Sequence, residues 1–299
     1  MADFLDSQTN GPTRLRSLLG HAVATQRPLV LPGCFDALSA RLAEAAGFDA
    51  LYMTGFGTTA SLLGRPDVGL LGGAEMIDNA RRIVEAVAVP VVADADTGYG
   101  NHLNVIRTVH DYERAGVAAI QIEDQVMPKK CGHMNDKAVV EVEGVVAKIA
   151  AALEARRDPD FAIIARTDAR APLGFDEAIR RGHRFLEAGA DMLFIEALID
   201  EAEIERVATE FAGVPLVFNW VEGGKTTAMP YDDIARLGFA LILQPVGPLL
   251  AAAGAMRQYL ARLRSEGTSE GFADDVMSFD DFTSTMGLRE IIDLDQRFT

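Results

Sequence analysis

Two aspartates stand two positions apart in the run Ala93-Asp94-Ala95-Asp96, directly after an apolar segment. On an extended chain such side chains point to one face, and two carboxylates held together repel unless a cation joins them. Glu123 follows another apolar segment, and Asp67 follows a proline. Oxygen ligands without His or Cys favour Mg²⁺ or Mn²⁺ with water in the remaining positions. We predict that these four carboxylates form a divalent-metal site. The alternative is that they cap helices, and for Asp67 a role in the turn after Pro66 is an equal alternative.

A second reactive cluster is the run Lys129-Lys130-Cys131-Gly132-His133. Cations and a histidine beside a thiol lower its pKa and make it a usable acid or base. Gly132 lets the chain bend closely over a ligand. A lysine pair alone is usually solvated and a lone loop cysteine often has no role, so it is the combination that predicts a catalytic thiol at Cys131. Cys34 lacks such neighbours and is expected to be a small buried residue.

A third group of side chains suits an organic anion. The run Tyr52-Met53-Thr54-Gly55 offers a phenol, a hydroxyl and backbone N–H groups, and Arg166 offers a planar two-pronged partner for a carboxylate. A pocket that combines a divalent cation, an arginine, a lysine pair and a histidine is built for an acid with two or three negative charges.

Eight short apolar runs alternate with amphipathic stretches of helical period. Continuous apolar runs are typical of parallel strands buried on both faces, and eight such units predict an α/β fold of the (β/α)8 TIM barrel class. An open doubly wound sheet is disfavoured because no G-x-G-x-x-G follows the first run. The expected strands are 29–31, 50–54, 90–93, 118–122, 162–165, 192–195, 216–218 and 240–243, and the expected helices between them are 37–46, 74–86, 103–114, 142–157, 175–188 and 201–211.

A weak repeat marks the helix-to-strand junctions. An apolar residue and a glycine precede four of the apolar runs, at Gly47, Gly116, Gly189 and Gly238. A glycine just past a helix can adopt positive φ and close the last turn. Because active sites of this fold lie at the carboxyl ends of the strands, the polar residues that follow the apolar runs are expected to meet there.

The chain is predicted to form one barrel domain over residues 1–299, with a helix over 12–26 closing its bottom. Further helices are expected over 249–266 and 281–299. The acidic link 265–275 contains glycine and serine, so the segment 276–299 is expected to lie apart from the barrel, exchanged with a neighbouring subunit.

Charge and composition limit the partners. The 299 residues carry 28 Lys and Arg against 44 Asp and Glu, a net charge of −16, which argues against nucleic acid or an anionic membrane as partner. Two cysteines are too few for a disulfide framework. The first residues lack a basic start, and no apolar run of about 18 residues occurs. We expect a cytoplasmic protein whose partner is a small-molecule carboxylate.

The motifs resemble those of the isocitrate lyase/phosphoenolpyruvate mutase superfamily, over nearly the whole chain. The resemblance rests on the runs 93–100, Ile122-Glu123-Asp124-Gln125 and 129–133. The Lys-Lys-Cys-Gly-His run is similar to the lyase branch, in which the cysteine is required. Within that branch, the short chain and the run 52–55 are similar to enzymes that cleave 2-methylisocitrate or 2,3-dimethylmalate.

The resemblance implies a Mg²⁺-dependent retro-Claisen or aldol-type cleavage of a 2-hydroxy di- or tricarboxylate to pyruvate or a related 2-oxo acid and a second acid. It also implies a homotetramer whose last helix packs on a neighbour. By family pattern, Asp96 binds the metal directly, while Asp67, Asp94 and Glu123 hold it largely through water.

The same resemblance assigns roles to the other side chains. Cys131, on a mobile lid, would protonate the carbanion left by cleavage, aided by Lys129 and His133. Tyr52 would help to remove the hydroxyl proton. The residues expected around the substrate carboxylates are Thr54, Gly55, Phe56, Gly132, Arg166, Glu196 and Asn219.

Two departures bear on the substrate. Phe56 stands where enzymes that cleave 2-methylisocitrate tend to have a small residue, and the run 219–224 is closer to the pattern of enzymes that cleave dimethylmalate. Both put a third substrate carboxylate in doubt. The alternatives on the same scaffold are an oxaloacetate hydrolase or decarboxylase and, more weakly because of Cys131, a phosphonate mutase. A barrel that only senses a 2-oxo acid is the non-enzyme alternative.

Overall fold

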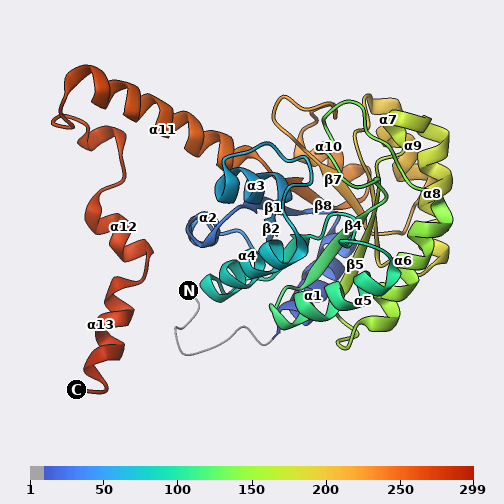
Figure 1. The fold of residues 1–299 in the computed structure, drawn as a ribbon, viewed down its shortest axis with the longest axis horizontal. Helices are drawn as coiled ribbons and strands as arrows, with labels where there is room; N and C mark the ends of the chain where they lie inside the picture. Colours follow the sequence, from blue (N-terminus) through green and yellow to red (C-terminus); the bar gives the residue numbers. More distant parts are fainter. Residues whose placement is uncertain (1–9) are drawn as a thin grey trace.

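Eight parallel strands close into a barrel in the computed structural model, which describes residues 10–299 (Figure 1). Each strand pairs with its neighbours along the chain, and β8 returns to β1 with Leu29 opposite Leu241. The predicted (β/α)8 barrel is confirmed. The strands are β1 (Leu29–Cys34), β2 (Leu51–Met53), β3 (Val91–Asp94), β4 (Ala119–Glu123), β5 (Ala162–Thr167), β6 (Met192–Ile195), β7 (Leu216–Asn219) and β8 (Phe239–Gln244).

Six strands extend further at their carboxyl ends than the apolar runs predict. Asp94, Glu123, Arg166 and Asn219 lie inside the hydrogen-bonded strands, where the apolar pattern stops short of them. β1 likewise continues to Cys34 and β8 to Gln244. The backbone ladder continues because it needs no apolar side chain. These polar side chains are therefore held by the barrel itself rather than by loops.

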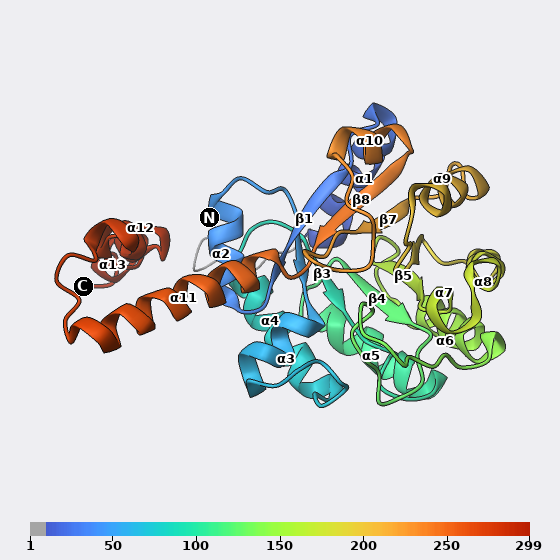
Figure 2. The same ribbon diagram turned by 90° about the horizontal axis from the view of Figure 1, so that it is seen from above.

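The predicted outer helices are present, and Figures 1 and 2 show them around the strands. Leu15 and Leu19 of α1 are buried against the barrel's lower end, as expected for a closing helix. The junction glycines Gly47, Gly116 and Gly189 have φ values of 90°, 83° and 96°, which confirms the predicted turns. The helices are α1 (Gly11–Thr25), α2 (Ala37–Ala45), α4 (Gly73–Ala86), α5 (His102–Arg114), α6 (Val142–Ala155), α8 (Phe175–Glu187) and α9 (Glu201–Glu210).

Three shorter helices escape the periodicity analysis: α3 (Gly55–Leu63), α7 (Arg170–Leu173) and α10 (Tyr231–Arg236). The α3 sequence begins with glycine, phenylalanine, glycine and two threonines, which are weak helix formers. The Thr54 side chain caps it by accepting a hydrogen bond from Gly57 N–H.

The barrel interior and the outer shell are separate apolar layers. The inner layer contains Tyr52, Val92, Ile164 and Phe194 together with the α1 leucines. Successive strand residues point to opposite faces, so inward positions recur every second residue. On β4, β5 and β6 this period places Glu123, Arg166 and the following Glu196 at the upper rim of the interior. The barrel geometry thus predicts which polar side chains enter the site.

The carboxyl-terminal helices extend away from the barrel (Figures 1 and 2). None of the 20 residues of α11 (Gly247–Glu266) is buried. After η1 (Ala273–Asp275), the predicted single helix over 281–299 is instead two, α12 (Phe279–Thr285) and α13 (Leu288–Gln296), because Gly287 adopts φ 80° between them. Arg41 of α2 donates to the Thr285 carbonyl at 3.3 Å. Exchange of this segment between subunits remains a prediction.

Across residues 10–299, no helix combines the length and apolar character that crossing a bilayer requires.

Candidate active site

A small cavity lies at the carboxyl ends of the strands. The segment 128–137, called the lid segment below, contributes to its wall together with residues at or just after the carboxyl ends of β2 to β8. The cavity is lined by Tyr52, Thr54, Phe56, Asp67, Asp94, Glu123, Lys129, Lys130, Cys131, Gly132, His133, Arg166, Phe194, Glu196, Asn219, Val221, Leu243, Pro245 and Val246.

Two predicted site residues, Gly55 and Asp96, are not part of the lining but lie directly behind it. A Cβ atom on Gly55 would be 2.6 Å from Asp94 Oδ2 and 3.5 Å from Asp96 Oδ1, so the glycine permits the close approach of this helix start to both carboxylates. All the residues predicted from the sequence therefore gather at one end of the barrel.

The two aspartates converge by a turn rather than by strand alternation. Asp94 ends β3, whereas Asp96 adopts φ 48°, so the expectation of one extended segment is wrong. The Asp96 N–H donates to Asp94 Oδ1 at 3.0 Å and fixes this turn. Asparagine and aspartate tolerate the left-handed region better than most residues, which makes the turn compatible with a carboxylate at position 96.

Lys129 enters this acidic group instead of facing the thiol. Its Nζ lies 2.7 Å from Asp67 Oδ2 and 2.7 Å from Asp96 Oδ1, and all three side chains are almost fully buried. Burial opposes the charge on Lys129, but Asp96, Asp94, Asp67 and Glu123 together raise its pKa well above the ordinary value. The ammonium therefore stays charged and neutralises part of the acidic group.

The acidic group retains unused oxygen atoms. Glu123 Oε1 is buried without a hydrogen-bond partner, and Asp96 Oδ1 faces Lys129 without hydrogen-bond geometry. Burial raises the pKa of Asp96 to about 6, although Lys129 opposes the shift. Burial likewise raises the pKa of Glu123 well above its usual range, with Arg166 opposing. A further positive charge would return both groups to their ordinary acidity.

These donors fit a hard divalent cation that keeps part of its water shell. Asp67, Asp94, Asp96 and Glu123 supply oxygen atoms only, the ligand type that Mg²⁺ prefers. Within residues 10–299, no group of three His, Cys, Asp or Glu side chains is arranged to hold a metal ion by itself. The chemistry of the site thus agrees with the predicted metal, and coordination has to involve water or ligand atoms.

Arg166 forms ion pairs with three buried carboxylates of the site. Its Nε and NH2 donate to the two oxygens of Asp168 at 2.9 and 3.0 Å. NH2 also lies 3.1 Å from Glu196 Oε2, and Nε lies 3.4 Å from Glu123 Oε2. The guanidinium stands 5.0 Å from the centre of the Phe194 ring. Such a fork, held from several sides, presents a fixed surface to a ligand carboxylate.

The thiol of Cys131 differs from the sequence expectation. The basic neighbours were expected to lower its pKa, but burial raises it to about 11, with the backbone N–H of His133 opposing. The expectation is wrong because Lys129 is paired with carboxylates and because Asp67 and Glu196 add negative charge nearby. Cys131 is therefore a neutral thiol at pH 7, which can donate a proton.

His133 is fixed by a second loop. Its Nδ1 accepts a hydrogen bond from Lys225 N–H at 2.8 Å, which assigns the ring proton to Nε2. Nε2 lies 3.3 Å from Glu196 Oε1 and 3.3 Å from Asn219 Nδ2. Burial lowers the pKa of His133, with Glu196 opposing. The imidazole therefore joins the lid segment to the strand ends, and it contacts Glu196 rather than the thiol.

Several site residues were missed by the sequence analysis. Gln121 joins Tyr52 to Asp94, accepting from the Tyr52 hydroxyl at 3.2 Å and donating to Asp94 Oδ1 at 3.4 Å. Gln121 and Asp168 share the inward alternation of Glu123 and Arg166, which is a signal that could have found them. Strand alternation could not have found Lys137, because this residue reaches Asp168 from the end of a loop.

The two cysteines should differ sharply in their reaction with iodoacetamide. At pH 8 Cys131 is expected to react about 100-fold more slowly than a thiol with the ordinary pKa of 9.0, because its pKa near 11 leaves little thiolate. Its rate should rise tenfold per pH unit towards pH 11. Cys34, fully buried with a pKa near 12, should stay unlabelled. Peptide mass spectrometry over pH 7–10 measures both; a Cys131 rate that levels off below pH 9 contradicts the shift.

The raised pKa of Cys131 also determines how the stability of the fold changes with pH. The folded-state pKa of Cys131 lies above its unfolded value, so the protonated thiol contributes stability that is complete below pH 9 and lost as the pH rises through 11.

The fold and this site define an enzyme class. The sequence family described as phosphoenolpyruvate phosphomutase matches residues 21–264. Together with the relatives below, this match shows that the chain belongs to the phosphoenolpyruvate mutase/isocitrate lyase superfamily. The predicted family is confirmed.

The relatives act on or bind small carboxylates. The 2,3-dimethylmalate lyase of Eubacterium barkeri is 46% identical over 289 residues, covering 97% of this chain and 98% of that protein. A probable 2-methylisocitrate lyase of Corynebacterium glutamicum is 42% identical, covering 87% and 85%. An oxaloacetate acetylhydrolase solved with 3,3-difluorooxalacetate superposes with a TM-score of 0.91 at 37% identity, covering 97% and 98%. A structure of phosphonopyruvate hydrolase with oxalate and Mg²⁺ superposes with a TM-score of 0.86 at 33% identity, covering 96% of this chain and 99% of that one.

The chain is therefore an enzyme of this superfamily that acts on small carboxylates, and it resembles the carbon–carbon lyases among its relatives. Mg²⁺ is bound by a member of the superfamily.

Proposed function

We propose that the protein is a Mg²⁺-dependent carbon–carbon lyase that cleaves an alkyl-substituted 2-hydroxy dicarboxylate of the 2,3-dimethylmalate type, with pyruvate or a related 2-oxo acid as one product. The observation that carries the proposal is the position of the Cys131 thiol, which lines the same cavity as Arg166 and the acidic group. Burial raises the pKa of this thiol to about 11, so it keeps its proton at neutral pH. Cleavage of a carbon–carbon bond beside a carboxylate leaves a carbanion, which needs a nearby acid that still holds its proton at neutral pH.

Two separate groups of residues in the cavity would bind the two ends of the substrate. Arg166, held in plane by Asp168 and Glu196, offers charge and hydrogen bonds to one carboxylate. Thr54 and Gly55 form the start of α3, where backbone N–H groups favour an anion. When bound, a Mg²⁺ held by Asp96 and, through water, by Asp67, Asp94 and Glu123 would supply Lewis-acid stabilisation to the 2-oxo acid product.

Tyr52 acts in this scheme as a hydrogen-bond partner. Burial raises the pKa of its phenol well above 10, with Asp94 adding to the shift, so the hydroxyl keeps its proton. It donates to Gln121 and can accept a hydrogen bond from the hydroxyl of the substrate. Tyr52 orients that hydroxyl, and a carboxylate has to take the proton.

The cavity wall supports alkyl substituents on the substrate. Phe56, Val221, Leu243, Pro245 and Val246 line the cavity and carry no charge. An unpaired carboxylate against such a wall would lose its hydration without compensation, whereas methyl groups gain from burial. This composition favours a substituted malate over a tricarboxylate such as 2-methylisocitrate.

A second candidate is hydrolysis of oxaloacetate. The superposition on oxaloacetate acetylhydrolase, with a TM-score of 0.91, favours it specifically. The products separate the two reactions, since hydrolysis gives oxalate and acetate, whereas the lyase gives a 2-oxo acid. A phosphonate mutase is less favoured because a lid thiol has no role in moving a phosphoryl group.

An assay of pyruvate release tests the proposal. The protein is offered 2,3-dimethylmalate, 2-methylisocitrate, isocitrate and oxaloacetate with Mg²⁺, and the product is reduced by coupled lactate dehydrogenase. We expect the highest kcat/KM with 2,3-dimethylmalate, and loss of turnover in excess EDTA that returns with added Mg²⁺ because the unused carboxylate oxygens need a cation. Oxalate and acetate from oxaloacetate, detected by NMR without pyruvate from any malate, would instead establish the hydrolase.

We also propose that the protein assembles as a homotetramer in which α12 and α13 pack on a neighbouring subunit. Exposed apolar side chains on the carboxyl-terminal helices support this arrangement, since such a surface is unfavourable in water. They include Leu250, Met256, Leu260, Phe279 and Ile292.

A further inference from the structure

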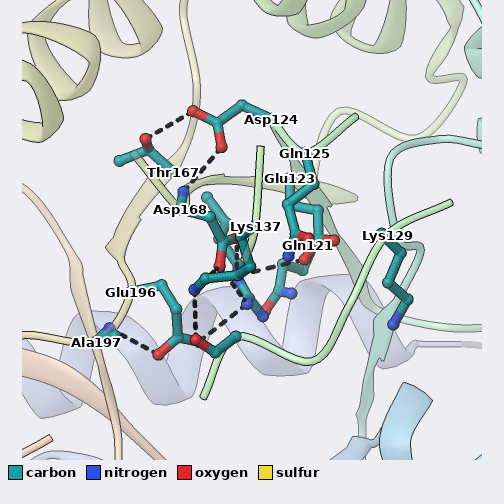
Figure 3. A network of polar contacts seen from close by, with 12 residues as sticks. Gln121, Glu123, Asp124, Gln125, Lys129, Lys137, Thr167, Asp168, Glu196 and Ala197 are labelled. Carbon is teal, nitrogen blue, oxygen red and sulfur yellow. Dashed lines mark hydrogen bonds and ion pairs between the residues drawn. The ribbon is translucent and has the colours of Figure 1, made fainter. Parts of the chain in front are cut away.

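The lid segment has a buried lysine at each end, Lys129 in the acidic group and Lys137 at Asp168. Lys137 lies at the end of this segment, yet its side chain is only 1% exposed. Its Nζ donates to Asp168 Oδ1 at 2.7 Å and also to the Gly132 carbonyl (Figure 3). One ammonium group thus binds both the lid backbone and a barrel carboxylate.

Asp168 is a rigid partner for this lysine. Its backbone N–H donates to Asp124 Oδ1 at 2.8 Å, and Asp124 in turn accepts from Thr167 Oγ1 at 2.6 Å (Figure 3). Asp124 also accepts from Arg181 Nη1 at 2.9 Å. Asp168 is fully buried. Because these contacts come from two strand ends and α8, Asp168 is fixed in position whatever the lid segment does.

The same carboxylate oxygen is shared with Arg166. Asp168 Oδ1 accepts from Lys137 Nζ at 2.7 Å and from Arg166 NH2 at 3.0 Å. When two cations share one carboxylate, each is attracted to a charge that the other partly neutralises. Lys137 therefore weakens the electrostatic attraction between Asp168 and the Arg166 guanidinium. When Lys137 withdraws, Asp168 binds Arg166 more strongly and leaves less of its charge for a ligand.

The lid backbone comes to rest on that guanidinium. A Cβ atom at Gly132 would lie 2.3 Å from Arg166 NH2 and 2.6 Å from Glu196 Oε2. A side chain at this position would collide with both groups, so the close approach needs a glycine, and Lys137 holds the Gly132 carbonyl there. Cys131 is the neighbouring residue, and its own N–H donates to the Asp67 carbonyl at 3.2 Å, so the backbone beside the thiol is held by Lys137 on one side and by Asp67 on the other.

We propose that Lys137 is a positioning residue that latches the lid segment onto Asp168 and thereby places the Cys131 thiol and frees Arg166 for a ligand carboxylate. This inference extends the proposed function, because the thiol is the proposed acid. A buried ion pair that only stabilised the fold would have little advantage over apolar side chains of similar size. This pair instead joins a loop to the residue that holds Arg166.

Alkylation of Cys131 tests the latch without any substrate. In Lys137→Met, iodoacetamide should label Cys131 at least about tenfold faster than in the unmodified protein at the same pH, because the lid segment opens more often. Arg16→Met is the matched control, since it breaks an ion pair with Asp191 at the opposite end of the barrel and should leave the rate unchanged. Cys34, which is fully buried, reports unfolding by becoming labelled.

A second variant guards against loss of the fold. Lys137→Gln keeps a hydrogen-bond donor of shorter reach without charge, and it should give an intermediate labelling rate with Cys34 silent. If the proposed substrate is turned over, both variants should raise KM through Arg166 and lower kcat through the thiol. Labelling of Cys131 at the unmodified rate in the folded variants overturns the latch. Absence of turnover on every acid overturns the proposed function and leaves the labelling result standing.

Discussion

Replacing Cys131 by alanine should lower turnover by about 10³- to 10⁴-fold, the upper part of the range for loss of a positioned general acid. The thiol is the proposed proton donor in the lid segment, and its raised pKa, about 11 through burial, keeps the proton in place at pH 7. The carboxylates and Arg166 do not depend on this side chain for their charges. Binding of oxalate with Mg²⁺, followed by calorimetry, should therefore change by less than threefold, while pyruvate release from 2,3-dimethylmalate nearly stops.

Two further variants sharpen this expectation. Cys34→Ala removes the other cysteine, which is buried in β1 with its thiol donating to the Tyr52 carbonyl at 3.4 Å, and should retain turnover. Cys131→Ser keeps the shape, but its hydroxyl is a far weaker acid than a thiol, so it should resemble the alanine variant. Turnover above one tenth of normal in Cys131→Ala shows that another group delivers the proton.

The fold could be derived from the sequence because its signals are local. A strand buried on both faces is apolar along its length, and a helix end before it needs a glycine such as Gly47 with positive φ. Several of the strand boundaries that failed lie where a polar side chain ends the apolar pattern before the strand itself ends. β4 and β5 continue into Glu123 and Arg166 because backbone pairing holds them, and no apolar criterion detects that.

The composition of the site was also predictable, but its electrostatics were not. Strand alternation gathers the rim residues, and the run of two lysines, a cysteine, a glycine and a histidine at 129–133 located the thiol. Burial is the main reason that the pKa of Cys131 is raised. The ammonium of Lys129, expected to lower it, is paired with Asp67 and Asp96, which stand 62 and 33 positions before Lys129 in the chain. Spacing along a loop says which charges are near in sequence, whereas the pKa responds to burial and to charges near in space.

Replacing Arg166 should affect stability and activity together, and the substituent should separate the two effects. In Arg166→Met, the buried carboxylates of Glu123, Asp168 and Glu196 lose their shared counter-charge, which is expected to destabilise the fold by about 3–5 kcal/mol. Turnover should be lost. Arg166→Lys keeps the charge but not the two-pronged geometry, so it should melt close to the unmodified protein and raise KM at least about tenfold.

The pH dependence of the free energy of unfolding tests whether Arg166 stabilises the fold through its charge. Without the guanidinium, the folded-state pKa of Glu123 rises further above its unfolded value, because Arg166 is the largest group that opposes its shift. A carboxyl group with a raised folded-state pKa destabilises the fold above that pKa, and the penalty fades as the pH falls and the group protonates. The deficit of Arg166→Met in free energy of unfolding should therefore be smaller at pH 5 than at pH 8, as measured by urea denaturation. An equal deficit at both values would mean that Arg166 stabilises the barrel through packing on Phe194 and not through charge.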